Sequence, residues 1–241
     1  MSTLKNKTAF ITGGSKGIGF GIAQALINEG VNVAITSRSL QAAQDAAEKL
    51  SSDKAKALGL KADVRNLIDQ EEAIKATVKE FGQVDYVIAN AGLGHFASIE
   101  ELTDKQWRET IDTNLTGVFY TIKSSVAELK KSEGYFITIS SLAGTNFFAN
   151  GAAYNASKFG LTGFTQAVML DLRNEGVSVS TIMPGSVSTH FNGNNPEEKK
   201  DEEAWKIQIE DLGELVVDLF KMNKRTLPSK IEVRPSQPGK K

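Results

Sequence analysis

Short apolar runs alternate with longer amphipathic segments along most of this chain. The short runs are rich in Val, Ile and Phe, as buried strands are, whereas the segments between them repeat apolar residues at helical spacing. Strands are predicted at 9–11, 31–36, 55–62, 86–89, 135–139, 177–183 and 231–233, and helices at 16–28, 40–50, 66–81, 103–131, 152–175 and 209–222. A regular alternation of strand and helix predicts an α/β fold around a parallel sheet.

No internal repeat or break in composition interrupts this alternation, so we predict one domain over residues 1–241. The expected fold is a doubly wound (Rossmann) parallel sheet with strand order 3-2-1-4-5-6-7 and helices on both faces. The segment 190–208 is polar, highly charged and contains Asn-Gly and Asn-Pro pairs that favour turns. A long insert of this kind is more often a lid than a linker, and we expect a substrate lid. Residues 235–241 are expected to form a flexible tail.

The first predicted strand leads into its helix through a glycine-rich turn with the spacing G-x-x-x-G-x-G. Glycines allow positive φ and let a ligand approach the backbone. The helix N-terminus that follows carries a partial positive charge, which suits a pyrophosphate. The spacing is neither the Walker P-loop nor the usual G-x-G-x-x-G fingerprint, and a turn made only for tight packing would look the same. The candidate dinucleotide contacts are Gly13, Ser15, Lys16, Gly17, Ile18 and Gly19.

The exit of the second predicted strand carries Ser37 and Arg38. In a dinucleotide fold an acidic residue here would hold the ribose hydroxyls of NAD, whereas an arginine accommodates the 2′-phosphate of NADP. Lys16 in the glycine turn is a second candidate cation for that phosphate. The alternative is that both cations are ordinary solvated surface charges. We expect NADP(H) as the cofactor.

Candidate cofactor contacts also follow the third and fourth strands, because the carboxyl ends of parallel strands face the ligand crevice. Asp63 is a candidate acceptor for the adenine amino group or the N-cap of the helix at 66–81, two roles that need not conflict. The small residues at 90–92 would let that loop pack against a cofactor, although a plain tight turn would look the same. The candidates in these two loops are Asp63, Val64, Asn90, Ala91 and Gly92.

Tyr154 and Lys158 are four residues apart in the helix at 152–175, which places both side chains on one face. A nearby ammonium is expected to lower the tyrosine pKa from about 10 by about 1–3 units, which makes a competent general acid for a carbonyl oxygen. The pair alone is weak evidence, since packing and solvent usually explain such residues. Asn114 lies in an apolar stretch of the helix at 103–131 and must find partners, because an unsatisfied amide costs about 1–3 kcal/mol. It marks a helix kink or a functional group.

The net charge, the residue composition and the lengths of the apolar runs argue against several classes of function. A formal net charge of −1 leaves no electrostatic footprint for nucleic acid or an anionic membrane. The chain has no cysteine and two histidines, so we expect no zinc site of the usual type and no other metal site. No apolar run approaches the roughly 18 residues of a membrane span, and the polar residues 1–7 do not resemble a signal peptide. The cytoplasm is the expected location.

Three segments with aromatic residues follow predicted strand ends, at 94–96, 147–148 and 190–191. Their side chains are candidates to line one apolar pocket. His95 and His190 are expected to contact substrate or to be plain loop residues, because Tyr154 already fills the acid–base role.

In these motifs the chain resembles the short-chain dehydrogenase/reductase family, over essentially its full length. Ser141, thirteen residues before Tyr154, falls where that family keeps its active-site serine, and Asn114 falls at its helix asparagine. The other matching segments are, in chain order, 12–19 (T-G-x-x-x-G-x-G), 90–92 (N-A-G), 154–158 (Y-x-x-x-K) and 184–189 (P-G-x-V-x-T).

The resemblance implies hydride transfer to or from a nicotinamide, with Tyr154 giving or taking the proton on the substrate oxygen. Lys158 would bind the nicotinamide ribose and lower the tyrosine pKa. Ser141 would hydrogen-bond the carbonyl oxygen, and Asn114 would anchor a water in a proton relay. The implied cofactor contacts extend to Tyr154, Lys158, Pro184, Gly185, Val187 and Thr189.

We therefore expect an NADPH-dependent oxidoreductase that reduces a ketone or aldehyde. The core resembles 3-oxoacyl-acyl-carrier-protein reductase, yet the Asp-Gly-Gly that follows the last strand in many members is missing, and small hydroxy-acid dehydrogenases are an equal option. The alternative from another class is a non-catalytic NADP-binding sensor or scaffold. Dense apolar positions on the helices at 103–131 and 152–175 predict a homo-oligomer, a tetramer or a dimer. The missing Asp-Gly-Gly makes the tetramer the weaker expectation.

Overall fold

The computed structural model of the protein describes residues 3–196 and 198–237. Within them, seven strands form one parallel sheet in the order β3-β2-β1-β4-β5-β6-β7, which confirms the predicted fold and strand order. The strands are β1 (Thr8–Thr12), β2 (Asn32–Ser37), β3 (Ala57–Lys61), β4 (Tyr86–Ala89), β5 (Tyr135–Ile139), β6 (Ser178–Pro184) and β7 (Lys230–Val233).

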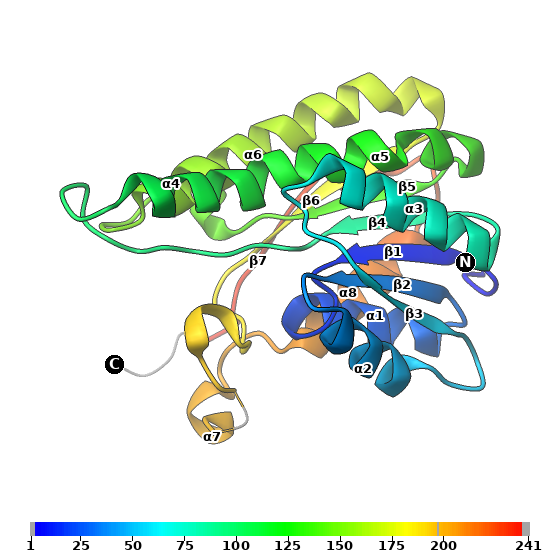
Figure 1. Cartoon of the computed structure of the whole chain (residues 1–241), viewed down its shortest axis with the longest axis horizontal. Helices are drawn as coiled ribbons and strands as arrows, with labels where there is room; N and C mark the ends of the chain where they lie inside the picture. Colours follow the sequence, from blue (N-terminus) through cyan, green and yellow to red (C-terminus); the bar gives the residue numbers. More distant parts are fainter. Residues whose placement is uncertain (1–2, 197, 238–241) are drawn as a thin grey trace.

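Helices cover both faces of the sheet (Figure 1). One face carries α1 (Gly17–Asn28), α2 (Leu40–Leu50) and α8 (Ile209–Lys221), and the other α3 (Leu67–Phe81), α4 (Asp104–Ile111), α5 (Gly117–Ser132) and α6 (Ala152–Leu172). Phe10 and Ile11 are neighbours in β1 and both are fully buried, in two different apolar clusters. Successive strand residues point to opposite faces, so a sheet covered on both sides needs apolar residues at every position. This explains why the central strands are predominantly apolar.

The helix predicted at 103–131 is helical from Asp104 to Ser132, and its geometry changes at Asn114, where a kink is one of the two expectations. A π-helical turn at Asp112–Thr116 separates α4 from α5. Inside this turn the buried Asn114 side chain accepts from Leu93 N at 2.9 Å and donates to Leu93 O at 2.8 Å. Its amide also donates to Ser157 Oγ at 3.0 Å. The wider turn satisfies a buried amide, and such turns often lie at functional sites.

Other differences lie at the ends of elements. The helix predicted to 175 ends at Leu172, and a 3-10 turn at Arg173–Glu175 follows it. The insert at 190–208 holds a 3-10 turn at Phe191–Gly193 and the short helix α7 (Lys200–Glu203). The tail predicted at 235–241 falls outside the described residues from 238 onward. The single domain, the lid and the flexible tail stay predictions. In the part of the chain that is described, no helix is both long and apolar enough to cross a bilayer.

Candidate active site

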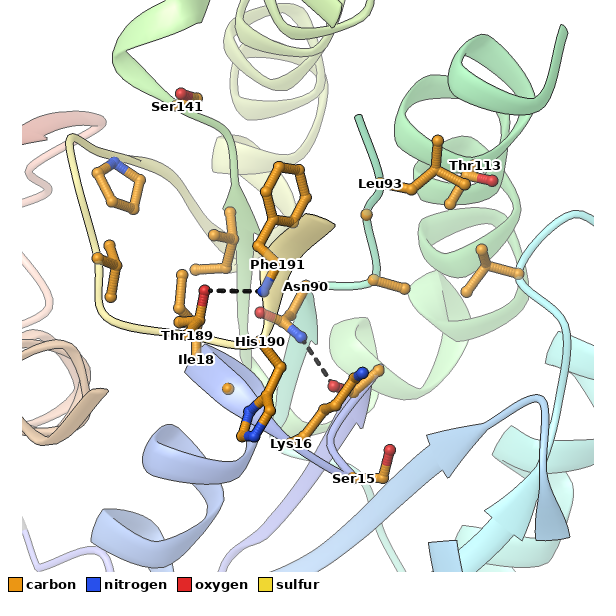
Figure 2. Close-up of a pocket in the computed structure, with 18 of the residues that line it drawn as sticks. Ser15, Lys16, Ile18, Asn90, Leu93, Thr113, Ser141, Thr189, His190 and Phe191 are labelled. Carbon is orange, nitrogen blue, oxygen red and sulfur yellow. Dashed lines mark hydrogen bonds between the residues drawn. The ribbon is translucent and has the colours of Figure 1, made fainter. Parts of the chain in front are cut away.

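A cavity of about 770 Å³ opens where the strands end, and its walls include residues that directly follow β1 to β6. Figure 2 shows residues from distant segments around it, among them Lys16, Asn90, Ser141 and Thr189. The cavity brings together almost all of the predicted site residues: Gly13, Ser15, Lys16, Gly17, Ile18, Ser37, Arg38, Asp63, Val64, Asn90, Ala91, Gly92, Ser141, Tyr154, Lys158, Pro184, Gly185, Val187 and Thr189.

Gly19 and Asn114 do not line the cavity. A Cβ on Gly19 would lie 2.5 Å from Asn90 Nδ2 and 2.8 Å from Gly13 O, so this glycine permits close packing behind the turn. Both amide hydrogens of Asn114 are used within the protein, which leaves only its Oδ1 with spare accepting capacity. The side chain therefore braces the loop at Leu93 from behind.

The glycine turn is held from the neighbouring strand. Asn90 Nδ2 donates to the carbonyl oxygens of Thr12 at 2.9 Å and Gly13 at 3.1 Å. Gly13 has φ +65°, and a Cβ there would approach Ala91 Cα to 3.0 Å. A side chain at Gly13 would therefore push the glycine turn away from the loop that contains Asn90 and Ala91. The N-A-G segment thus sets the shape of the turn.

The N-terminus of α1 is open. Its N-cap residue Lys16 makes no capping hydrogen bond through its side chain, and the first turn contains no acidic residue. Amide groups at such an end have no partner within the helix and attract an anion. Together with the glycine at position 17, which has φ +59°, this cradle fits the pyrophosphate of a dinucleotide.

Lys158 and Tyr154 share one face of α6 at the other end of the cavity. Lys158 Nζ donates to Ile139 O at 2.9 Å and lies 5.7 Å from the centre of the Tyr154 ring. The lysine is only 5% exposed, and this burial lowers its pKa to about 8. Ser141 is the next residue but one after β5, and Ala143 N donates to its Oγ at 3.1 Å.

The tyrosine pKa differs from the sequence-based expectation. Burial raises the pKa of Tyr154, and the Ser141 hydroxyl opposes part of that rise. The expected net lowering is not what the structure shows, because the buried phenol has lost solvent, which disfavours its charged form. The phenol is accordingly a proton donor in this state.

An ion pair occupies the opposite wall, below the end of β3. Arg65 Nε lies 3.0 Å from Asp63 Oδ1, and Arg65 Nη2 lies 2.5 Å from Oδ2. This hydrogen bonding lowers the pKa of Asp63, with a smaller electrostatic contribution from Arg38. The proposed N-cap role of Asp63 is wrong, since Asn66 accepts from Ile68 N and caps α3. Sequence reasoning missed Arg65, although its place two residues beyond Asp63 was a usable signal.

The insert after β6 is tied down by one buried acid. Glu203 accepts from Ser188 Oγ at 2.6 Å, from Asn194 Nδ2 at 3.0 Å and from Lys206 Nζ at 2.5 Å. The lysine and serine hydrogen bonds lower the pKa of Glu203 to about 2, so the carboxylate stays ionised at neutral pH. We call these four residues the lid latch. Nothing in the sequence marked Glu203 among the many acids of this segment.

Neither histidine is placed as an acid–base group. His95 Nε2 lies 3.1 Å from Glu109 Oε2 on α4, and His190 lies in the cavity wall near Lys16 (Figure 2). Among the described residues, no group of three or more His, Cys, Asp or Glu is arranged to hold a metal ion.

The profile of the family described as short chain dehydrogenase matches residues 7–200. The chain belongs to the short-chain dehydrogenase family. This match covers the glycine turn, the N-A-G segment and the Ser141, Tyr154 and Lys158 cluster.

Relatives in this family include a putative ketoacyl reductase from Streptomyces coelicolor, 30% identical over 96% of this chain and 89% of the relative. A glycine betaine reductase from Emericella nidulans is 34% identical over 89% of this chain. The chain spans 17% of the length of that fungal protein.

Solved structures of short-chain dehydrogenases superimpose closely. An alcohol dehydrogenase from Thermococcus sibiricus, complexed with 5-hydroxy-NADP, has a TM-score of 0.87 and 30% identity, and the match covers 98% of this chain and 99% of that one. A 3-ketoacyl-(acyl-carrier-protein) reductase from Brucella melitensis, complexed with NADH, has a TM-score of 0.86 over 97% and 98% of the two chains. At 23% identity, the second match shows the fold alone.

The buried lysine of this short-chain dehydrogenase generates a testable pH dependence. Below pH 8 the folded and unfolded chains both carry the Lys158 ammonium, so the folded state bears the full cost of burying it. Between pH 8 and the ordinary value of 10.5, the unfolded chain keeps the proton that the folded chain has released, so stability rises with pH. From pH 7 to pH 10, the free energy of unfolding should rise in the parent relative to Lys158→Met by on the order of 1–3 kcal/mol.

Urea unfolding at the two pH values measures this difference. Lys75→Met, at an exposed position on α3, is the matched control and should track the parent at both pH values. A Lys158→Met difference that stays constant with pH would contradict a lowered lysine pKa.

Proposed function

We propose that the protein is an NADPH-dependent oxidoreductase that reduces a ketone or aldehyde to an alcohol. The observation that carries this proposal is the meeting of Tyr154, Ser141 and Lys158 at one end of a cavity whose other end is an open helix N-terminus. An acid–base group and an anion cradle in the same cavity are what a dinucleotide-dependent carbonyl reduction needs. Membership of the short-chain dehydrogenase family and the printed names of its relatives support the same conclusion.

The cofactor would lie along the cavity. The pyrophosphate would be held by the glycine turn and the amides at the start of α1. The nicotinamide end would be held by Lys158 and by the segment 184–189, through Pro184, Gly185, Val187 and Thr189. When bound, NADPH supplies the hydride, and the protein supplies position and polarity.

Tyr154 would donate its proton to the substrate oxygen as hydride reaches the carbonyl carbon. Its raised pKa keeps the proton on the phenol until the oxygen becomes basic. The Ser141 hydroxyl would hydrogen-bond the same oxygen and oppose the charge that develops on it. Lys158 would return a proton to Tyr154, a role that suits a pKa of about 8.

The choice of NADPH over NADH is part of the proposal. Lys16, Ser37 and Arg38 line the cavity together, with no acidic residue at the exit of β2. Arg65 adds a third cation to this wall, although its charge is largely engaged by Asp63. The 2′-phosphate of NADP would meet Arg38 and Lys16, both of which present charged donors.

A non-catalytic NADP-binding sensor or scaffold is the alternative. It would bind the cofactor and reduce no carbonyl. A small-molecule substrate, a cytoplasmic location and independence from nucleic acid and membranes remain expectations that accompany the leading proposal.

Replacing the proton donor tests the reaction. Tyr154→Phe should lower kcat for ketone reduction by about 10²–10⁴-fold, because removing a positioned general acid costs that much. Ser141→Ala should lower kcat with NADPH affinity kept, whereas Lys158→Met should lower both. NADPH oxidation at 340 nm with a ketone panel and fluorescence titration of NADPH measure the two effects. Tyr120→Phe, which removes a hydroxyl outside the cavity, is the control, and an active Tyr154→Phe would refute the mechanism.

Exchanging two residues at the exit of β2 tests cofactor choice. A hydrogen bond from a charged donor contributes about 1.5–3 kcal/mol, so two phosphate contacts should give NADPH a preference of about a hundredfold or more in kcat/KM. Ser37→Asp combined with Arg38→Ile should reverse it, because an aspartate repels the phosphate and accepts from the ribose hydroxyls. Lys56→Ile removes a cation just before β3, at the opposite end of the strands, and should leave the preference unchanged. Equal efficiency with both cofactors in the parent would sink the proposal.

We also propose that the protein forms a homo-oligomer through α5 and α6. Phe119 on α5 meets Phe164 on α6, and Phe119, Phe159 and Leu170 are each more than 40% exposed. Apolar side chains on adjoining helices are covered when a second copy packs by a two-fold axis. Light scattering at micromolar concentration should return a dimer or tetramer, and Phe159→Glu should shift it toward monomer. A parent mass near 26 kDa would overturn this prediction.

A further inference from the structure

We propose that the carbonyl substrate of this site carries an aromatic ring and no carboxylate beside the carbonyl. This inference rests on the proposed function and adds the class of substrate. It follows from the rings around Tyr154 and from the distribution of charge along the cavity.

Phenylalanine rings from two separate segments contact the Tyr154 ring, and a third ring packs on one of them. The Phe96 ring, in the loop after β4, lies 5.4 Å from the Tyr154 ring, edge to face at 71°. The Phe191 ring, from the start of the insert, lies 5.9 Å away at 56°. Phe148, in the loop before α6, lies 5.7 Å from Phe96. The entrance to the proposed proton donor is therefore framed by rings in the tilted and edge-to-face arrangements that aromatic groups prefer.

The rings converge on one point of the backbone. A Cβ added at Gly94 would lie 2.9 Å from Phe96 Cζ and 3.1 Å from Phe191 Cζ. Two phenyl groups from distant segments thus meet over a residue that has no side chain. We call Phe96, Phe148 and Phe191 the aromatic frame.

The aromatic frame leaves apolar surface open. Its three rings are 45%, 48% and 39% exposed. Phe147, next to Phe148, is 86% exposed and makes no ring contact of this kind with the residues that the structure describes. Half-open rings packed on one another beside a polar acid–base group present a surface that a flat apolar group would cover.

The positions of the cations along the described part of the cavity favour ketones without a carboxylate beside the carbonyl over 2-oxo acids. Lys16 and Arg38 belong to the glycine-turn end. Arg65 is paired with Asp63, and Lys206 with Glu203. In Figure 2 the Phe191 and His190 side chains project in opposite directions, with His190 toward Lys16.

The remaining lining cation, Lys158, is 5% exposed and donates to Ile139 O. His95, the residue before Phe96 in the chain, is paired with the Glu109 carboxylate. A carboxylate next to the carbonyl would find no open cation among the described residues there, so a 2-oxo acid would lose its hydration without compensation.

Three ketones of matched shape test the substrate class with NADPH. 4-Phenyl-2-butanone and 2-oxo-4-phenylbutanoate differ only in a methyl or a carboxylate on the carbonyl. 4-Cyclohexyl-2-butanone replaces the phenyl ring by a saturated ring. We expect kcat/KM for 4-phenyl-2-butanone to exceed that for the oxo acid by at least about tenfold, and that for the cyclohexyl ketone by about 2- to 10-fold, the range that one aromatic contact supplies.

Leucine replacements show which rings produce the preference for the phenyl ketone. Phe96→Leu and Phe191→Leu should each reduce the ratio of phenyl to cyclohexyl efficiency, mainly through KM, while the cyclohexyl ketone serves as an internal measure of intact chemistry. Phe147→Leu is the matched control and should leave the ratio unchanged. Equal or better turnover of the oxo acid or the cyclohexyl ketone overturns the proposal, and so does a ratio that Phe96→Leu and Phe191→Leu leave unchanged.

Ligand-observed NMR of the same three ketones, with NADP⁺ present, separates this inference from the proposed function. Selective binding of the phenyl ketone that weakens in Phe96→Leu supports the aromatic frame even where no ketone is reduced, a result that would count against the reaction alone. Binding that does not distinguish the three ketones overturns the inference even where all three are reduced.

Discussion

A line of polar contacts between β5 and α6 is the constraint on which the site depends. Thr138 Oγ1 lies 2.9 Å from Thr165 Oγ1, Ser140 Oγ lies 3.1 Å from Thr162 Oγ1, and Lys158 Nζ donates to Ile139 O. All of these atoms are buried, where an unmade hydrogen bond is costly, so α6 has one favourable register against the strand. Tyr154 belongs to α6, and Ser141 follows β5 by two residues. The register of α6 against β5 therefore brings the Tyr154 and Ser141 side chains together in the cavity.

The fold and most of the cavity could be predicted from the sequence because local rules act there without competition. Parallel strands buried on both faces must be largely apolar, and seven strand-like runs separated by helices leave few arrangements. The glycines at 13 and 17 do adopt positive φ, which the turn requires of them. Residues that follow strand ends meet at one edge of the sheet, which is why nineteen predicted site residues scattered from Gly13 to Thr189 line one cavity.

The features that could not be predicted depend on partners distant in the chain or on solvent. A kink at Asn114 is among the sequence-based expectations, but Leu93 and Ser157, which satisfy its amide in the π-helical turn, are not marked as partners by any spacing. Asp63 is engaged by Arg65, whereas helix-capping rules alone made it a candidate N-cap. The Tyr154 pKa rises because burial disfavours the charged phenolate, and burial is a property of the assembled site. The spacing of residues in the sequence predicts which charged groups lie close together. It does not predict how much water those groups lose when the site is assembled.

The lid latch links the segment that would hold the nicotinamide to the segment that contacts the proposed proton donor. Ser188, which donates to Glu203, directly precedes Thr189, which would face the nicotinamide. Phe191, two residues beyond Thr189, contacts the Tyr154 ring. One carboxylate, that of Glu203, therefore restrains the backbone on which both groups stand. Because its folded-state pKa is about 2, its stabilising contribution is complete above its ordinary value of 4.5 and is lost only as pH falls from there toward 2. The latch carboxylate is therefore ionised at neutral pH, and changes of pH near 7 should not weaken its hold on this segment.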